Sequence, residues 1–184
     1  MRAVAVGTTV LLALLVLGGC NKKDDNPTSP TTTANDVFAS GNVKNTPVYF
    51  SFDTKDSVAV SGAWDIELAV VPILADPSTN FYVSFPVIIL NRARNVQAKI
   101  VDSLAFDSVD AATVTGLQTD PTDTTYVIGE QCLSYNDVNH TLNPYDNRTF
   151  VIKTGSGKLV KMRMLSYYND AGASGYMKFE YVIE

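Results

Sequence analysis

The stretch "NRTFVIKTGSGKLVKMRMLSYYNDAGASGYMKFEYVIE", residues 147–184, decides the fold class of this chain. Three runs in it, residues 148–154, 158–168 and 176–183, alternate apolar and polar side chains, which is the pattern of half-buried strands. Two turn-forming sequences separate the runs, first "TGSGK" and then "NDAGASG". The stretch is therefore predicted to form an antiparallel three-strand meander, with its polar groups on the face opposite the apolar one.

The preceding residues show the same two-residue period. In "VYFSF", residues 48–52, every second side chain is large and apolar. In "AWDIELAV", residues 63–70, the apolar set alternates with Asp65 and Glu67, which are predicted to lie on the opposite, polar face. This apolar set consists of Trp64, Ile66, Leu68 and Val70.

Evidence for helices is weak along the whole chain. Only "DSLAFDSVDAATV", residues 102–114, is compatible with a short helical turn. Pro86, inside "NFYVSFPVII", indicates an edge strand or a bulge, because proline cannot donate to a sheet ladder. The predicted class is all-β with antiparallel sheets.

The N-terminal sequence predicts a targeting signal. Residues 10–17 are apolar and only Arg2 supplies positive charge before them. This segment is too short for a membrane-spanning helix, which needs about 20 residues, but it suits a secretory signal peptide. The "LGGC" that follows resembles a bacterial lipobox, which predicts a signal peptide over residues 1–19 and a lipidated Cys20; the alternative is a chance cysteine after a plain signal peptide.

A tether and one domain follow this signal. Residues 20–35, "CNKKDDNPTSPTTTAN", contain no large apolar side chain. Such a composition cannot bury enough surface to offset its ordering entropy, so a disordered tether is predicted. Its "KKDD" resembles the export signals of surface-displayed lipoproteins or is a solvated linker. Residues 36–184 have a globular composition and the length of a single β domain.

The charge balance excludes one class of function. The chain has 14 basic and 19 acidic side chains, a net charge of −5, and removal of residues 1–19 takes away one further positive charge, Arg2. An acidic chain of this kind lacks the basic footprint of a nucleic-acid-binding protein. We therefore predict no nucleic-acid partner.

No catalytic or metal-binding constellation is visible, and an enzyme is not predicted. His140 is the sole histidine and no nucleophile-elbow sequence is present. Cys132 has no cationic neighbour in sequence and is expected to be a buried small hydrophobe rather than a reactive thiol. Asp120 and Asp123, in "TDPTDTT", lack the pattern of a calcium loop and are expected to begin turns.

Aromatic residues are the remaining indication of function. Nine tyrosines and eight phenylalanines occur in the chain. Aromatic walls with few polar anchors suit a pocket for a flat ligand, and a plain β core has the same composition. The sequence leaves both interpretations open for the clustered aromatics, which are Phe81, Tyr82, Tyr167, Tyr168, Tyr176, Phe179 and Tyr181.

Two of these segments resemble a known family. "AWDIEL" after "VYFSF" is similar to the Trp-Asp-[Ile/Leu/Met] signature of the HmuY-like bacterial lipoproteins, and residues 147–184 resemble the closing meander of that family. The resemblance spans residues 48–184. It implies an all-β, non-catalytic lipoprotein that captures haem for iron acquisition at the outer membrane, exposed at the cell surface, with a TonB-type receptor as partner.

The iron ligands of the family have no matching residues in this chain. The founding type of the family uses a pair of histidines from two loops, whereas this chain has only His140; the family's second ligand position falls near Asp137. Relatives also use methionine, and Met162, Met164 and Met177 are predicted on strands. The candidate ligand-binding residues are therefore His140 with Tyr135 or Tyr145 as a partner. The alternative is a surface lipoprotein of the same fold that has lost haem ligation and has another binding or structural role.

Overall fold

A computed structural model describes residues 35–184 of the chain. The predicted signal peptide (1–19) and tether (20–35) lie outside the described residues, except for Asn35. The described part consists of strands and four short 3-10 helices. The strands are β1 (Asp36–Asn42), β2 (Val48–Ser51), β3 (Asp56–Val58), β4 (Ile66–Asp76), β5 (Phe81–Leu90), β6 (Gln97–Asp102), β7 (Ser134–Asn136), β8 (Thr141–Asn143), β9 (Arg148–Lys153), β10 (Leu159–Tyr168) and β11 (Ser174–Ile183); the helices are η1 (Arg92–Arg94), η2 (Phe106–Ser108), η3 (Ala111–Thr113) and η4 (Glu130–Cys132).

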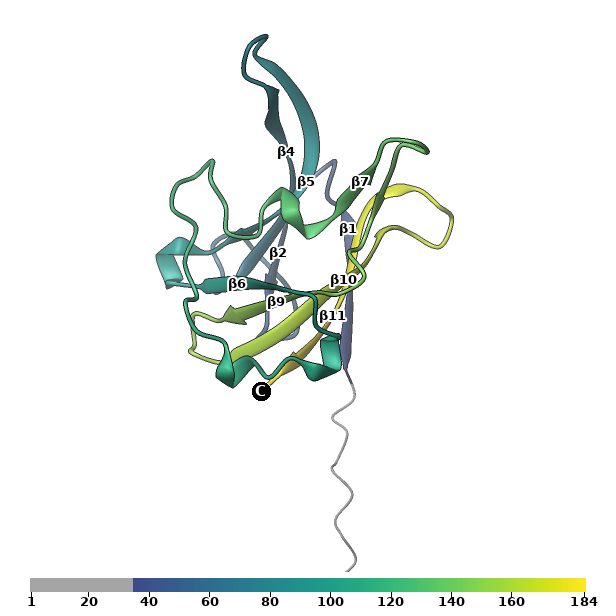
Figure 1. The fold of residues 1–184 in the computed structure, drawn as a ribbon. Helices are drawn as coiled ribbons and strands as arrows, with labels where there is room; N and C mark the ends of the chain where they lie inside the picture. Colours follow the sequence, from purple (N-terminus) through teal and green to yellow (C-terminus); the bar gives the residue numbers. More distant parts are fainter. Residues whose placement is uncertain (1–34) are drawn as a thin grey trace, which may run out of the picture. The chain divides into compact units, whose positions relative to one another are not determined.

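Two antiparallel sheets and one hairpin make up the architecture (Figure 1). The five-stranded sheet has the order β1-β11-β10-β9-β6, the four-stranded sheet has the order β3-β2-β4-β5, and β7 pairs with β8. The apolar faces of the two sheets share one core, in which the ring centroids of Phe50 on β2 and Phe179 on β11 are 5.2 Å apart. This confirms the predicted all-β, antiparallel class.

The C-terminal meander is confirmed as β9, β10 and β11. Val160, Met162 and Met164 of β10 are buried in the core, as their alternation predicts. The alternation does not continue to the end of β10, because the register shifts between Met164 and Ser166. Tyr167 is therefore buried, in place of the Ser166 that strict alternation would put on the core face.

The middle of the chain is more regular than its prolines suggest. Pro72 lies inside β4, and its partner Ser84 on β5 is part of a long hairpin. β5, which contains Pro86, is an edge strand of its sheet, and so the structure decides between the edge strand and the bulge that this proline indicates. Within residues 102–114 the structure has two 3-10 turns, η2 and η3. Within residues 35–184 there is no helix of the length and apolarity that a membrane span requires.

Cys132 is buried at the end of η4, with 1 % of its surface exposed. Burial raises the pKa of its thiol. Because the thiolate is the reactive form, this environment makes Cys132 inert, in agreement with its expected role as a small hydrophobe.

The position of Asp65 differs from the sequence prediction. Alternation puts it on the polar face of its strand, but β4 begins only at Ile66, and Asp65 is fully buried. Its carboxylate accepts backbone hydrogen bonds from Phe52 (3.0 Å) and Gly155 (3.0 Å). It also accepts a charged hydrogen bond of 3.0 Å from Nη1 of Arg94. A carboxylate deprived of water is stable only with such partners.

The Asp65 network joins segments that are distant in sequence. Phe52 follows β2 of the four-stranded sheet, Gly155 lies in the β9–β10 turn of the five-stranded sheet, and Arg94 belongs to η1. A Cβ atom at Gly155 would lie 2.8 Å from the guanidinium of Arg94, so only glycine allows the turn to approach this closely. The buried Asp65 carboxylate and its partners therefore connect the two sheets at one end.

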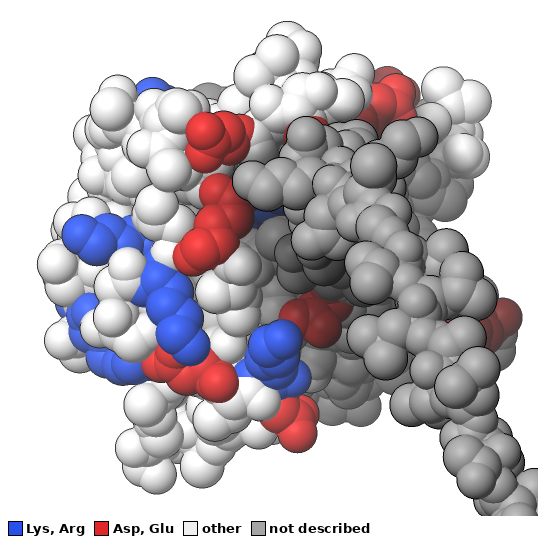
Figure 2. Space-filling view, turned by 90° about the horizontal axis from the view of Figure 1, so that it is seen from below, with Lys and Arg blue, Asp and Glu red and all other residues white. Residues whose placement is uncertain are grey.

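Charged side chains outside this network are mixed in sign. On the face shown in Figure 2, basic and acidic side chains lie beside one another. Two ion pairs outside the network join neighbouring strands: Arg148 with Asp102, and Arg163 with Glu180.

We predict that Asp65→Ala lowers the free energy of unfolding by about 2–4 kcal/mol, because it leaves the buried N–H of Phe52 without its acceptor and Arg94 with Asp53 as its remaining counter-ion. Urea denaturation followed by circular dichroism measures this change. Asp146→Ala serves as the control, because Asp146 is exposed, and it should change the stability by less than about 0.5 kcal/mol. Equal stabilities of the two variants would contradict the role assigned to Asp65.

Candidate functional site

A cavity of about 490 Å³ lies where three hairpins meet. The β4–β5, β7–β8 and β10–β11 hairpins all extend toward the same end of the molecule (Figure 1). Each contributes to the wall, and the lining residues are Lys44, Val70, Ser84, Pro86, Tyr135, His140, Leu142, Tyr167, Tyr168 and Ser174. Its size is within the range of small-molecule sites.

Tyr135 and His140 form a hydrogen-bonded pair in this cavity. The phenol oxygen of Tyr135 is 2.6 Å from Nδ1 of His140. Tyr135 lies on β7, and His140 ends the β7–β8 turn in a left-handed conformation with φ of 55°. Because Nδ1 is engaged with the phenol, Nε2 is the imidazole nitrogen that remains for a ligand; within residues 35–184 it has no hydrogen-bond partner.

Two further lining residues are aromatic. The rings of Tyr167 and Tyr168 pack edge to face with centroids 5.7 Å apart. The phenol oxygen of Tyr168 accepts a hydrogen bond of 3.0 Å from the backbone N–H of Leu142. This bond attaches the β7–β8 hairpin to β10 and so sets the position of the Tyr135–His140 pair.

An apolar cavity of about 370 Å³ adjoins the first. Ser84, Tyr135 and Leu142 line both cavities, and Val83 and Phe85 of β5 complete the second. The two cavities together provide a continuous surface that is apolar over β5 and polar around His140. Such a surface suits a flat, largely apolar ligand with a few polar groups.

One basic side chain lies at this site. Nζ of Lys44 donates a hydrogen bond of 2.5 Å to Oγ of Ser174 and is the single cation among the lining residues. A ligand carboxylate at the rim would find its counter-ion here.

The structure brings together two of the three predicted ligand-binding residues. Tyr135 and His140 line the same cavity, whereas Tyr145 does not. The guanidinium of Arg148 lies 3.7 Å from the centroid of the Tyr145 ring, so this ring is engaged in a cation–π contact elsewhere. Met162, Met164 and Met177 are also absent from the cavity, because all three are buried in the core.

Sequence reasoning did not assign Lys44, Ser84 or Tyr168 to the site. The adjacent tyrosines at 167 and 168 are compatible with a pocket wall, but the sequence does not decide between core and pocket. The structure assigns Phe179 and Tyr181 to the core, whereas Phe81 and Tyr82 are more than half exposed near the tip of the β4–β5 hairpin. Nothing in the sequence around Lys44 or Ser84 indicates a binding site.

The two loop aspartates have structural contacts. Asp120 is buried, and its carboxylate accepts backbone hydrogen bonds from Leu90 and Val127, each of 2.7 Å. Asp120 thus attaches the 120–127 loop to β5, whereas the sequence predicts that it begins a turn. Asp123 pairs with Arg92. Among residues 35–184, no three His, Cys, Asp or Glu side chains are grouped so that they could hold a metal ion.

Solved structures share this fold. The HmuY analog TFO of Tannerella forsythia, in its apo form, is 12% identical, with a TM-score of 0.56 over 82% of this chain and 96% of that chain. Apo PinO from Porphyromonas gingivitis is 12% identical, with a TM-score of 0.53 over 83% of this chain and 98% of that one. A protein from Bacteroides vulgatus described as HmuY-like and heme-binding is 14% identical, with a TM-score of 0.50 over 80% and 91%.

The sequence itself matches a family model. No curated protein matches the chain. The model of the HmuY protein family matches residues 43–181, which include β2 through β10 and most of β11. The similarity that the "AWDIEL" strand and the C-terminal meander indicate is thereby confirmed, and this chain belongs to the HmuY protein family.

Proposed function

We propose that this protein captures haem in the cavity formed by the β4–β5, β7–β8 and β10–β11 hairpins. The observation that carries the proposal is the 2.6 Å contact between Tyr135 and His140 inside an aromatic-walled cavity. Membership of the HmuY family and the heme-binding description of the Bacteroides vulgatus protein support it. The protein acts by binding and release and catalyses no reaction.

The donor set fits a haem iron. Imidazole and phenolate are both established axial ligands of haem. An iron-binding histidine usually donates its second ring N–H to an acceptor, which fixes the ring orientation. With its proton on Nδ1, His140 would donate to the Tyr135 phenol oxygen in this way, which leaves an unprotonated Nε2 for the iron. We therefore assign His140 as the iron ligand and Tyr135 as the residue that positions it.

The remaining lining suits the rest of the haem molecule. Tyr167 and Tyr168 offer aromatic surface, and the adjoining cavity over Val83 and Phe85 offers apolar surface. Lys44 supplies a positive charge for a propionate. No second axial ligand is assigned, because the methionines that alternation places on strands lie in the core.

The cellular setting is proposed from the N-terminal sequence and the family. The lipobox-like "LGGC" supports anchoring through a lipidated Cys20, and two acyl chains hold a protein stably to a membrane. The family resemblance supports an outer-membrane location with exposure at the cell surface. Iron acquisition through a TonB-type receptor is the role that this setting favours.

Titration of the protein with haemin, followed through the Soret band, tests the proposal. We expect a saturable, shifted band at one haem per chain. His140→Ala should abolish the shift, and Tyr135→Phe should weaken binding by about 10–100-fold, the usual effect of losing a partner that orients a ligand. Tyr145→Phe is the matched control and should bind haemin like the parent protein.

Two outcomes would overturn parts of this proposal. A shifted band that is unchanged in His140→Ala would remove His140 as the ligand. A featureless titration of the parent protein would reject haem capture and favour the alternative, a lipoprotein of the same fold with another binding or structural role.

The Tyr168 phenol provides a separate prediction about the cavity wall. Tyr168→Phe removes the acceptor for the Leu142 N–H and should cost about 1 kcal/mol of local stability. Hydrogen exchange measured by NMR should show faster exchange of the Leu142 amide, together with weaker haemin binding. Tyr82→Phe, an exposed tyrosine on the β4–β5 hairpin, should change neither quantity. Unchanged exchange at Leu142 in Tyr168→Phe would show that the phenol does not hold the hairpin.

A further inference from the structure

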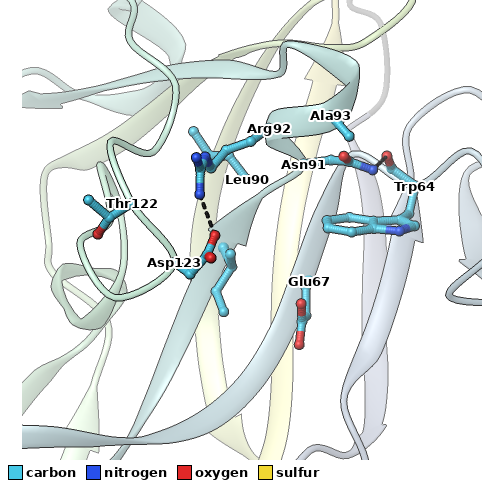
Figure 3. Close-up of a pocket in the computed structure, with 9 residues that line it drawn as sticks. Trp64, Glu67, Leu90, Asn91, Arg92, Ala93, Thr122 and Asp123 are labelled. Carbon is cyan, nitrogen blue, oxygen red and sulfur yellow. Dashed lines mark hydrogen bonds and ion pairs between the residues drawn. The ribbon is translucent and has the colours of Figure 1, made fainter.

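A separate cavity of about 600 Å³, here called the outer cavity, lies over the outer face of the four-stranded sheet (Figure 3). Trp64, Glu67, Asn91, Arg92 and Asp123 line it, together with residues of the β5 end and of the 120–127 loop. None of its lining residues belongs to the Tyr135–His140 cavity. A ligand in this cavity would therefore contact none of the residues proposed to bind haem.

Trp64 is held rigidly at one wall. Its indole Nε1 donates a hydrogen bond of 3.0 Å to the carbonyl oxygen of Val60. Its own carbonyl oxygen accepts hydrogen bonds from Asn91 (3.0 Å) and Arg94 (3.1 Å). The ring of Tyr49 packs against the indole at a centroid distance of 5.2 Å. The aromatic surface that faces the cavity is thus preorganised.

Glu67 is a carboxylate without a counter-ion. It lies on the outer face of β4, half-buried, between its strand neighbours Tyr49 on β2 and Ile89 on β5. Within residues 35–184 its carboxylate has neither a hydrogen-bond donor nor an ion-pair partner, and burial raises its pKa. The nearby cation, Arg92, is paired with Asp123 across the cavity (Figure 3).

The charges of the lining leave one negative charge uncompensated. Arg92 and Asp123 neutralise one another, so the charge of Glu67 is what the cavity presents to a ligand. A partly desolvated carboxylate is costly unless an opposite charge joins it. An aromatic face attracts cations through its quadrupole, and tryptophan does so most strongly. Both features favour the same class of ligand.

We propose that this cavity binds an organic cation, a guanidinium or ammonium group that stacks on the Trp64 ring and pairs with Glu67. The cation is carried either by a small molecule or by a basic side chain of a partner peptide. A second binding function of this kind goes beyond haem capture and uses a different face of the molecule.

The protein contains its own reporter for this site. Trp64 is the single tryptophan of the chain, so its fluorescence responds at the proposed site alone in haem-free protein. The probe is N-acetyl-arginine amide, and the matched neutral probe is N-acetyl-citrulline amide, which has the same shape without the charge. We expect a saturable change in fluorescence with the arginine probe and at least about tenfold weaker binding of the citrulline probe, the effect of about 1.4 kcal/mol.

Variants separate this proposal from general charge effects. Glu67→Gln should weaken binding of the arginine probe by at least about tenfold, whereas Glu130→Gln, at an exposed glutamate outside the cavity, should leave it unchanged. Trp64→Leu, followed by calorimetry, should also weaken binding. Circular dichroism of each variant checks that it is folded. His140→Ala should bind the arginine probe like the parent protein, so failure of haem capture and failure of this site are distinguishable.

A second comparison identifies whether a peptide or a small molecule carries the cation. An acetylated Gly-Arg-Gly amide that binds tighter than the single-residue probe would identify a partner peptide, and equal affinities would identify a small molecule. Equal binding of the arginine and citrulline probes, binding unchanged in Glu67→Gln, or no fluorescence response to the arginine probe would each overturn the proposal.

Discussion

The buried carboxylate of Asp65 is the constraint on which much of this structure depends. Because no water reaches it, its charge must be matched by the Arg94 guanidinium and by the N–H groups of Phe52 and Gly155. Meeting that requirement connects the end of β2, the β9–β10 turn and η1. The two sheets are therefore joined at this end by directional bonds, in addition to the non-directional packing of their core.

The outer cavity and the Tyr135–His140 cavity use this scaffold in different ways. Arg94, held by Asp65, also bonds the carbonyl oxygen of Trp64, so the Asp65 network helps to position the aromatic wall of the outer cavity. The Tyr135–His140 cavity lies among hairpins that extend beyond the sheets, and the Tyr168 phenol attaches one of them to β10. The outer cavity is thus tied to the Asp65 network, whereas the Tyr135–His140 cavity depends on how its hairpins are held.

The family fold and the ligand set are separable in this protein. A β scaffold common to the family supports whatever donors its loops present, so membership establishes the architecture and not the ligand. Here the turn between β7 and β8 brings His140 within 2.6 Å of the Tyr135 phenol oxygen, and the chain has no second histidine. The methionines of β10 and β11 fill the core, where flexible side chains accommodate irregular space.

The sequence by itself determined the all-β class, the C-terminal meander and the burial of Cys132, and it limited Pro86 to an edge strand or a bulge, because two-residue periodicity and local composition are properties of short segments. Tertiary structure alone decided that Asp65 is buried, that Tyr167 replaces Ser166 on the core face at a bulge, and that His140 meets Tyr135 rather than Tyr145. These outcomes depend on register and on contacts between distant segments. Alternation along one strand shows which faces differ, but only the packing of both sheets decides what each face meets.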